Sequence, residues 1–180
     1  WGVPQDTEAR PMFYNKAKLL ELGWSQEEVD GLPQRILEGG FTLDDMIATA
    51  KQAIEAGVGG PAKGYLHRPT KGGDFLQYYH AYGGELYDAE QDKLVVTPAA
   101  VEQWYAFQRR VVEEGITPEN FIGTEFTIWH QTVSAGDVLF WNGGIWQWAD
   151  WAANYVADKG GNDYLFGFVG YALQPSGIKG

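Results

Sequence analysis

The chain has 180 residues, of which 44% are hydrophobic and 15% aromatic, and its formal net charge at pH 7 is −11. At this length roughly 70% of the unfolded surface becomes buried, so we expect one folded domain with a substantial core. The acidic balance argues against nucleic acids and anionic membranes as partners, no apolar run approaches the roughly 20 residues that span a bilayer, and the lack of cysteine excludes disulfides and thiolate metal sites.

The first third of the chain predicts one strand and several helices with clear start signals. Residues 10–14 can be extended and lead into a short helix over 17–22. Ser25 has capping-box spacing to the glutamate three residues on, and Thr42 opens another helix in a similar way. The apolar residues of that second helix fall on one face, which we expect to be buried: Leu43, Met46, Ile47, Ala50 and Ile54.

A dense polar loop separates an expected strand at 64–66 from an expected helix at 75–82. In doubly wound α/β domains, ligands bind at the carboxyl ends of the strands. We therefore expect His67 and Arg68 to face a binding cleft. Asp74 either contacts ligand there or caps the following helix.

The best-marked helix begins at Thr97, the expected N-cap, with Pro98 at its first position. A further helix is expected over 125–134, and the apolar, aromatic run 165–173 is typical of a strand. Strands separated by helices of this length imply crossover connections, which favour a mainly parallel sheet covered on both faces. The buried stripe of the Thr97 helix is predicted to contain Val101, Trp104, Tyr105, Val111 and Val112.

Residues 136–151 are the most informative stretch. An apolar run at 138–141 has strand composition, stops at a Gly-Gly pair and gives way at once to a helical pattern. Gly143 and Gly144 allow a sharp turn and a close approach of backbone to a ligand. Backbone N–H groups at a helix start can meet hydroxyl groups while an indole covers the apolar face of a flat, hydroxyl-rich ligand.

Four aromatic residues follow this turn. Trp148, Trp151 and Tyr155 share one helical stripe, which indicates core packing. Trp146 points to roughly the other side of such a helix, and we expect it to be exposed to ligand.

Three segments resemble maltose-binding-protein-like solute-binding proteins, the extracytoplasmic receptors of ABC sugar importers. The order and spacing of the three agree with that family. The first segment, Gly136–Phe140 and Asn142–Trp148, is similar to the family's G-x-x-A-M and N-G-P-W-x-W motifs. The second is similar to the family's hinge segment and consists of Gly2-Val3-Pro4, Glu8-Ala9, Phe13–Lys16 and Leu22-Gly23. The third, Tyr82–Asp88, is similar to its G-G-x-x-x-D motif.

The resemblance implies a non-catalytic α/β lobe of the type II periplasmic-binding-protein fold that spans residues 1–180. It corresponds to the second of the family's two lobes, with the first lobe and a secretion signal absent. The family docks on a membrane ABC permease, which implies a periplasmic or extracytoplasmic location. Glu8 falls where the family places a carboxylate that accepts sugar hydroxyl hydrogen bonds; alternatively it is a solvated acid beside Arg10.

The expected ligand is a carbohydrate or polyol, with no cofactor. The three histidines lack helical ligand spacing, so no metal site is expected. One alternative is a carbohydrate-active hydrolase domain, which would need two carboxylates at a defined separation across the sugar. Another is an isolated or engineered fragment with no ligand function of its own. Exposed aromatic residues on the cleft face would also favour a homo-oligomer through that face.

Overall fold

The computed structural model describes residues 8–60, 62–70 and 72–178. Gly2-Val3-Pro4, the first part of the hinge resemblance, lies outside these residues. The strands are β1 (Met12–Asn15), β2 (Tyr65–Leu66), β3 (Tyr87–Asp88), β4 (Lys93–Leu94), β5 (Phe140–Asn142) and β6 (Val169–Ala172). The helices are α1 (Lys16–Glu21), α2 (Gln26–Leu37), α3 (Leu43–Glu55), α4 (Leu76–Ala81), α5 (Pro98–Glu113), α6 (Phe126–Ser134), α7 (Gln147–Asp150) and α8 (Asn162–Phe168), with short helical turns η1 (Gly73–Phe75), η2 (Trp151–Tyr155) and η3 (Ala157–Lys159).

The central sheet has four strands in the order β2-β5-β1-β6. The pair β2–β5 is parallel, whereas β1 runs antiparallel to both β5 and β6, with Met12 opposite Ala172. The predicted α/β class is confirmed, but the sheet is mixed rather than mainly parallel. The spacing of strands and helices along the sequence indicated crossover connections. It did not reveal that β1 would insert between β5 and β6 and run antiparallel to both.

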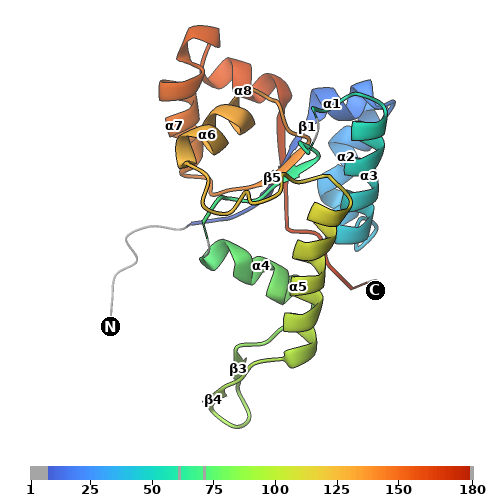
Figure 1. Cartoon of the computed structure of the whole chain (residues 1–180), viewed down its shortest axis with the longest axis vertical. Coiled ribbons are helices and arrows are strands. Elements are labelled where there is room, and N and C mark those ends of the chain that lie inside the picture. The colour runs from blue at the N-terminus through green and yellow to red at the C-terminus, as the bar shows by residue number, and fades with distance from the viewer. Residues whose placement is uncertain (1–7, 61, 71, 179–180) are drawn as a thin grey trace.

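Both faces of the sheet are covered by helices (Figure 1). The helices α1, α2 and α3 lie on one side and α6, α7 and α8 on the other. Side chains of β1 alternate between two buried clusters: Met12 and Tyr14 join the first, and Phe13 joins the second. Because helices cover both faces of the sheet, the apolar run 138–141 is buried throughout.

Local helix signals give the starts of α2 and α3. Ser25 and Glu28 form a reciprocal capping box, and Thr42 and Asp45 form another. Thr97 is the N-cap residue of α5, as predicted, but its side chain makes no cap hydrogen bond. Its hydroxyl oxygen instead accepts the Glu85 N–H at 3.2 Å, which ties α5 to the loop after α4.

The predicted buried stripe of α5 is wrong in part. The fully buried residues of the helix are Ala100, Phe107 and Val111, whereas Tyr105 is 63% exposed. The face of α5 that carries Ala100, Phe107 and Val111 contacts α4 and the sheet, where the ring of Phe107 meets those of Tyr78 and Tyr65. The sequence of this helix has two apolar faces, and only packing against α4 and the sheet selects the buried one.

The C-terminal apolar run is also divided differently from the prediction. Residues 162–168 form α8, and only Val169–Ala172 form a strand. Leu165 and Phe168 are one helical turn apart and both buried, so a helix satisfies the same apolar residues. Trp151 in η2 is buried and Trp148 and Tyr155 pack against its cluster, in agreement with the predicted packing stripe.

No helix within the described ranges is both long and apolar enough to span a membrane.

Candidate ligand-binding site

The turn after β5 is held by a close approach that only glycine permits. A Cβ on Gly144 would lie 2.0 Å from the ring of Trp146, so the indole rests directly against this backbone. The N–H of Gly144 donates to Oε1 of the buried Gln147 at 2.7 Å. The predicted turn is therefore present, but its Gly144 amide is already satisfied within the protein.

The same turn fixes the segment that precedes β1. The N–H of Ile145 donates to the carbonyl of Ala9 at 3.1 Å. Ala9 lies between Glu8 and Arg10, so this backbone bond places both of their side chains beside the β5 turn. Two segments more than 130 residues apart in the sequence thus meet at one edge of the sheet.

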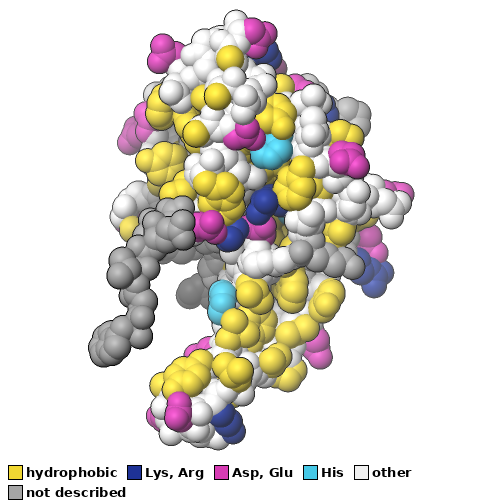
Figure 2. Space-filling model, turned by 90° about the vertical axis from the view of Figure 1, so that its left-hand side faces the viewer, with side chains coloured by type: hydrophobic (Ala, Val, Ile, Leu, Met, Phe, Trp, Pro, Cys, Tyr) yellow, Lys and Arg dark blue, Asp and Glu magenta, His cyan; other side chains and the backbone are white. Residues whose placement is uncertain are grey.

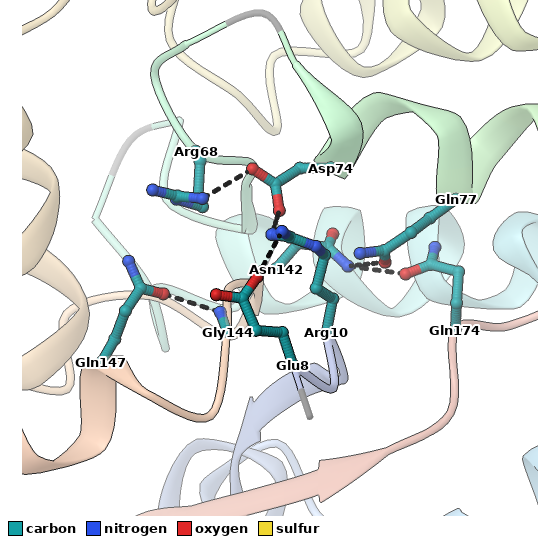
Figure 3. A network of polar contacts seen from close by, with 9 residues as sticks. All are labelled: Glu8, Arg10, Arg68, Asp74, Gln77, Asn142, Gly144, Gln147 and Gln174. Carbon is teal, nitrogen blue, oxygen red and sulfur yellow. Dashed lines mark hydrogen bonds and ion pairs between the residues drawn. The ribbon is translucent and has the colours of Figure 1, made fainter. Parts of the chain in front are cut away.

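Four charged side chains converge there, and we call them the arginine cluster: Glu8, Arg10, Arg68 and Asp74 (Figure 3). Arg10 donates to Asp74 at 2.8 Å and to Glu8 at 3.0 Å, and Arg68 donates to the other Asp74 oxygen at 2.8 Å. The Asp74 side chain is only 8% exposed, against 28% for Arg10 and 17% for Arg68. Its charge is thus compensated by two guanidinium groups, while Glu8 remains on the exposed rim.

Trp146 is half-buried and lies under the arginine cluster. The guanidinium carbon of Arg10 lies 4.6 Å from the indole centroid, and that of Arg68 lies at 5.7 Å. Arg68 also lies 5.0 Å from the ring of Phe126. These cation–π contacts orient the guanidinium planes. Arg10 thus covers one face of the ring that we expected to be free for a ligand.

The structure brings together Glu8, Arg68, Asp74, Gly144 and Trp146, with Gly143 in the same turn, but it does not bring His67 to them. His67 is 5% exposed and packs against Phe75 and Phe121 at ring-centroid distances of 5.1 and 5.5 Å. Burial lowers the pKa of its imidazole, and its Nδ1 contacts the carbonyl of Arg68 at 2.6 Å. His67 therefore belongs to the core below the loop.

The capping role considered for Asp74 is wrong. The N-cap residue of η1 is Gly72 and that of α4 is Phe75, and neither helix start has a side-chain cap hydrogen bond. Both Asp74 oxygens accept from arginines instead. Glu8 pairs with Arg10, as in the alternative interpretation of Glu8 as a solvated acid beside that residue, but the pair is part of the larger cluster.

A second polar network lies behind the arginine cluster, at the end of β5. The side-chain oxygen of the buried Asn142 accepts the hydroxyl groups of Tyr65 at 2.7 Å and Tyr78 at 2.5 Å. Its Nδ2 donates to Oε1 of Gln77 at 3.4 Å and to Oε1 of Gln174 at 2.6 Å. Burial raises the pKa of Tyr78 well above its ordinary value, so its hydroxyl stays a donor. Of these residues, only Asn142 was singled out in the sequence analysis, as the residue before the glycine pair.

Gln77 and Gln174 line a cavity of about 650 Å3 whose rim includes Glu8 and Arg10 and whose wall includes Leu37 and Leu173. A neighbouring hollow of about 480 Å3 shares Arg10, Leu37, Leu173 and Gln174 with it. In Figure 2 basic and acidic side chains gather in the middle of one face, between hydrophobic side chains above and below. The site combines fixed polar groups with apolar walls, which is the composition of a small-molecule binding site.

A family model described as "Bacterial extracellular solute-binding protein" matches residues 1–180. No curated protein matches the chain significantly. Among solved structures, the GacH receptor of Streptomyces glaucescens GLA.O, studied unliganded and with acarbose, is 21% identical with a TM-score of 0.67; the match covers 99% of this chain and 40% of that one.

Two further solved structures are similar. Maltose-bound MalE3 of T. maritima is 23% identical with a TM-score of 0.68, over 97% of this chain and 40% of that one. An ABC transporter solute-binding protein from Thermotoga lettingae TMO, bound with α-D-tagatose, is 20% identical with a TM-score of 0.66, over 98% of this chain and 41% of that one. At these identities the likeness concerns the fold, and the chain spans about two fifths of the length of the structures it matches.

Proposed function

This chain belongs to the family of bacterial extracellular solute-binding proteins, and on that premise we propose that it is the second lobe of a two-lobed receptor that captures a carbohydrate or polyol for an ABC importer. It binds its ligand without chemical change and works outside the cytoplasm, in the periplasm or its equivalent. The similar structures with acarbose, maltose and tagatose support a sugar as the ligand class.

The observation that carries this proposal is the convergence of the arginine cluster with Trp146 at the carboxyl end of β5. Glu8 supplies acceptor oxygens, and the two arginines supply N–H donors whose planes are fixed by the indole and by Asp74. A sugar presents neighbouring hydroxyl groups that both donate and accept hydrogen bonds. A neutral set of two cations and two anions matches such an uncharged, hydroxyl-rich ligand better than it matches an ion.

Half a cleft leaves much of a ligand in water. Small-molecule sites usually bury about 70–90% of the ligand surface, so a single lobe should bind sugar weakly. Closure against a first lobe would bury the remaining face and complete the site. Micromolar or tighter binding of a monosaccharide by the monomeric chain would contradict this one-sided arrangement.

A hydrolase domain is the less supported alternative. Glycoside hydrolysis needs one carboxyl group that gives a proton to the leaving group and a second that acts on the sugar. The two carboxylates at this site both accept hydrogen bonds from Arg10, which suits them to binding. Release of phenol from aryl glycosides by the purified chain would favour the hydrolase.

Ligand-observed NMR with a panel of neutral sugars tests the proposal directly, because it detects millimolar affinities. We expect saturation transfer to at least one sugar or polyol, lost in Arg10→Met. Arg109→Met is the matched control, since Arg109 forms an exposed ion pair within α5. A folded chain that transfers no saturation to any sugar at tens of millimolar, or an Arg10→Met variant that binds like the control, would refute the proposal and leave a fragment without ligand function.

A further inference from the structure

The imidazole of His130 carries its proton on one defined nitrogen atom. The buried indole of Trp151 donates its Nε1–H to Nδ1 of His130 at 2.8 Å. An indole N–H can only donate, so Nδ1 accepts and the proton of the neutral ring lies on Nε2. Burial lowers the pKa of His130, which keeps the ring neutral near neutral pH. His130 therefore presents a single donor, its Nε2–H group.

This donor reaches the surface of the protein. Among the residues that the structure describes, none accepts a hydrogen bond from Nε2 of His130, yet this atom is not enclosed, unlike the indole nitrogens of Trp129 and Trp141. The His130 side chain is 13% exposed. The ring of Tyr155 stacks on the imidazole at a centroid distance of 5.1 Å and fixes its plane. The donor is thus accessible and held in one orientation.

Phe126 connects His130 to the arginine cluster. The two residues lie one turn apart on α6 and project from the same side of that helix, with ring centroids 6.0 Å apart. Phe126 also lies 5.0 Å from the guanidinium carbon of Arg68, which itself lies 5.7 Å from the indole centroid of Trp146. The surface beside Trp146 therefore continues past Arg68 to a second, half-buried aromatic ring and then to the His130 donor.

A hydrogen-bond acceptor lies beside this donor. Oδ2 of Asp150 is 3.9 Å from Nδ1 of His130, and the Asp150 side chain is 43% exposed. Its other oxygen accepts from Nδ2 of Asn154 at 2.6 Å. Oδ2 of Asp150 is therefore the oxygen that can accept from a ligand.

An ion fits this group of side chains poorly. A metal ion finds no free lone pair on His130, because Nδ1 is bonded to Trp151 and Nε2 carries the proton. An anion would meet the Asp150 carboxylate. One donor, one acceptor and one aromatic ring instead suit a neutral ligand with hydroxyl groups and an apolar face.

We propose that Phe126, His130 and Asp150 form a second subsite beside the arginine cluster and that the ligand is an oligosaccharide of at least two rings, an inference that rests on the proposed function. The first ring lies at Trp146 and the arginine cluster. The second ring packs its C–H face on Phe126. One of its hydroxyl oxygens accepts from Nε2–H of His130, and one of its hydroxyl groups donates to Asp150.

The test compares disaccharides with their component sugars on the 180-residue chain by ligand-observed NMR. The probes are maltose and cellobiose against glucose, and lactose against glucose and galactose. We expect at least one disaccharide to bind about tenfold more tightly than its component sugars, because it adds two hydrogen bonds and a ring contact. Proton–nitrogen spectra of the histidine side chains should show His130 protonated on Nε2, with a signal that shifts with this disaccharide and not with its component sugars.

Two variants locate the preference. His130→Asn keeps an oxygen near the position of Nδ1 for Trp151 and removes the Nε2–H donor, and Phe126→Leu removes the ring. Each should reduce the ratio of disaccharide to monosaccharide affinity about fivefold or more. Tyr105→Leu, which removes an exposed ring from α5, is the control and should keep this ratio.

The outcomes separate this inference from the proposed function. Equal affinity for every disaccharide and its component sugars, or a preference that both variants retain, would overturn the second subsite and leave sugar binding intact. Binding of none of these sugars would overturn both.

Discussion

Replacing Asp74 by asparagine should destabilise the protein far more than a typical loss of an ion pair. The substitution keeps the shape of the side chain but leaves the exposed Glu8 as the one carboxylate paired with this cluster among the residues that the structure describes. One arginine keeps a hydrogen bond to the remaining amide oxygen, which no longer carries a negative charge, and the other loses its 2.8 Å hydrogen bond because an amino group replaces the carboxylate oxygen that it faced.

The size of the effect follows from the burial of the three groups. Removing one partner from a buried ion pair costs about 3–5 kcal/mol. Arg10 is more than a quarter exposed and therefore partly screened by water, so we take the lower end, about 3 kcal/mol. For a domain of this size that corresponds to a fall in Tm of about 6–12 °C.

Urea and thermal unfolding followed by circular dichroism measure this change. Asp137→Asn is the control, because it removes the carboxylate of another ion pair, Lys63–Asp137, which lies on the surface at 3.3 Å. The loss of such a surface pair should cost about 0–1 kcal/mol of stability. If Asp74→Asn and Asp137→Asn destabilise equally, the arginine cluster is not the buried network described above.

Three further predictions follow from the same region. Gly144→Ala should displace the Trp146 indole, abolish sugar-dependent NMR signals and lower the free energy of unfolding by about 1–3 kcal/mol. The control Gly31→Ala, which has open space around it in α2, should raise the free energy of unfolding by about 0.5–1 kcal/mol. Equal effects of the two substitutions in urea unfolding would contradict the close contact at Gly144. Because burial lowers the pKa of His67, the folded state favours the neutral ring, and this stabilisation is present above about pH 6.5 and lost as the pH falls further. The free energy of unfolding should therefore decline from pH 7.5 to 5, and His67→Phe should reduce this decline. The same pH dependence of the unfolding free energy in the variant would argue against the prediction. Association through the cleft face should strengthen with salt, which screens the charge of −11, and weaken in Trp146→Ser; sedimentation of a strict monomer at high protein and high salt would exclude it.

Local chemistry made parts of this fold readable from the sequence. The capping boxes at Ser25 and Thr42 involve residues three apart, so no distant partner was needed to recognise them. The glycine turn after β5 was predictable for the same reason. By contrast, the antiparallel pairing of β1 and the buried face of α5 depend on neighbours far away in the chain. The sheet expected to be mainly parallel is therefore mixed, and the predicted stripe of α5 is wrong in part.

The candidate site shows the same division. Glu8, Arg68, Asp74 and Trp146 could be named one by one from their segments. Their ionic partner Arg10 entered the prediction only as a neighbour of Glu8, because its bond to Asp74 joins residues 64 apart. Gln77 and Gln174 carried no sequence signal at all: their roles come from sharing one nitrogen of Asn142, which only the folded sheet creates.

The pairing of β1 with β6 has a mechanical consequence. Met12 lies opposite Ala172, so Arg10 and Gln174, just outside the two strands, leave the ladder at the same end. A force applied between these two residues would load the β1–β6 hydrogen bonds one after another, as in opening a zipper, rather than all together in shear. The strand at the edge of the sheet should therefore peel away at low force before the rest of the domain unfolds. An optical-trap recording with handles at Arg10 and Gln174 would show this as an early, short extension.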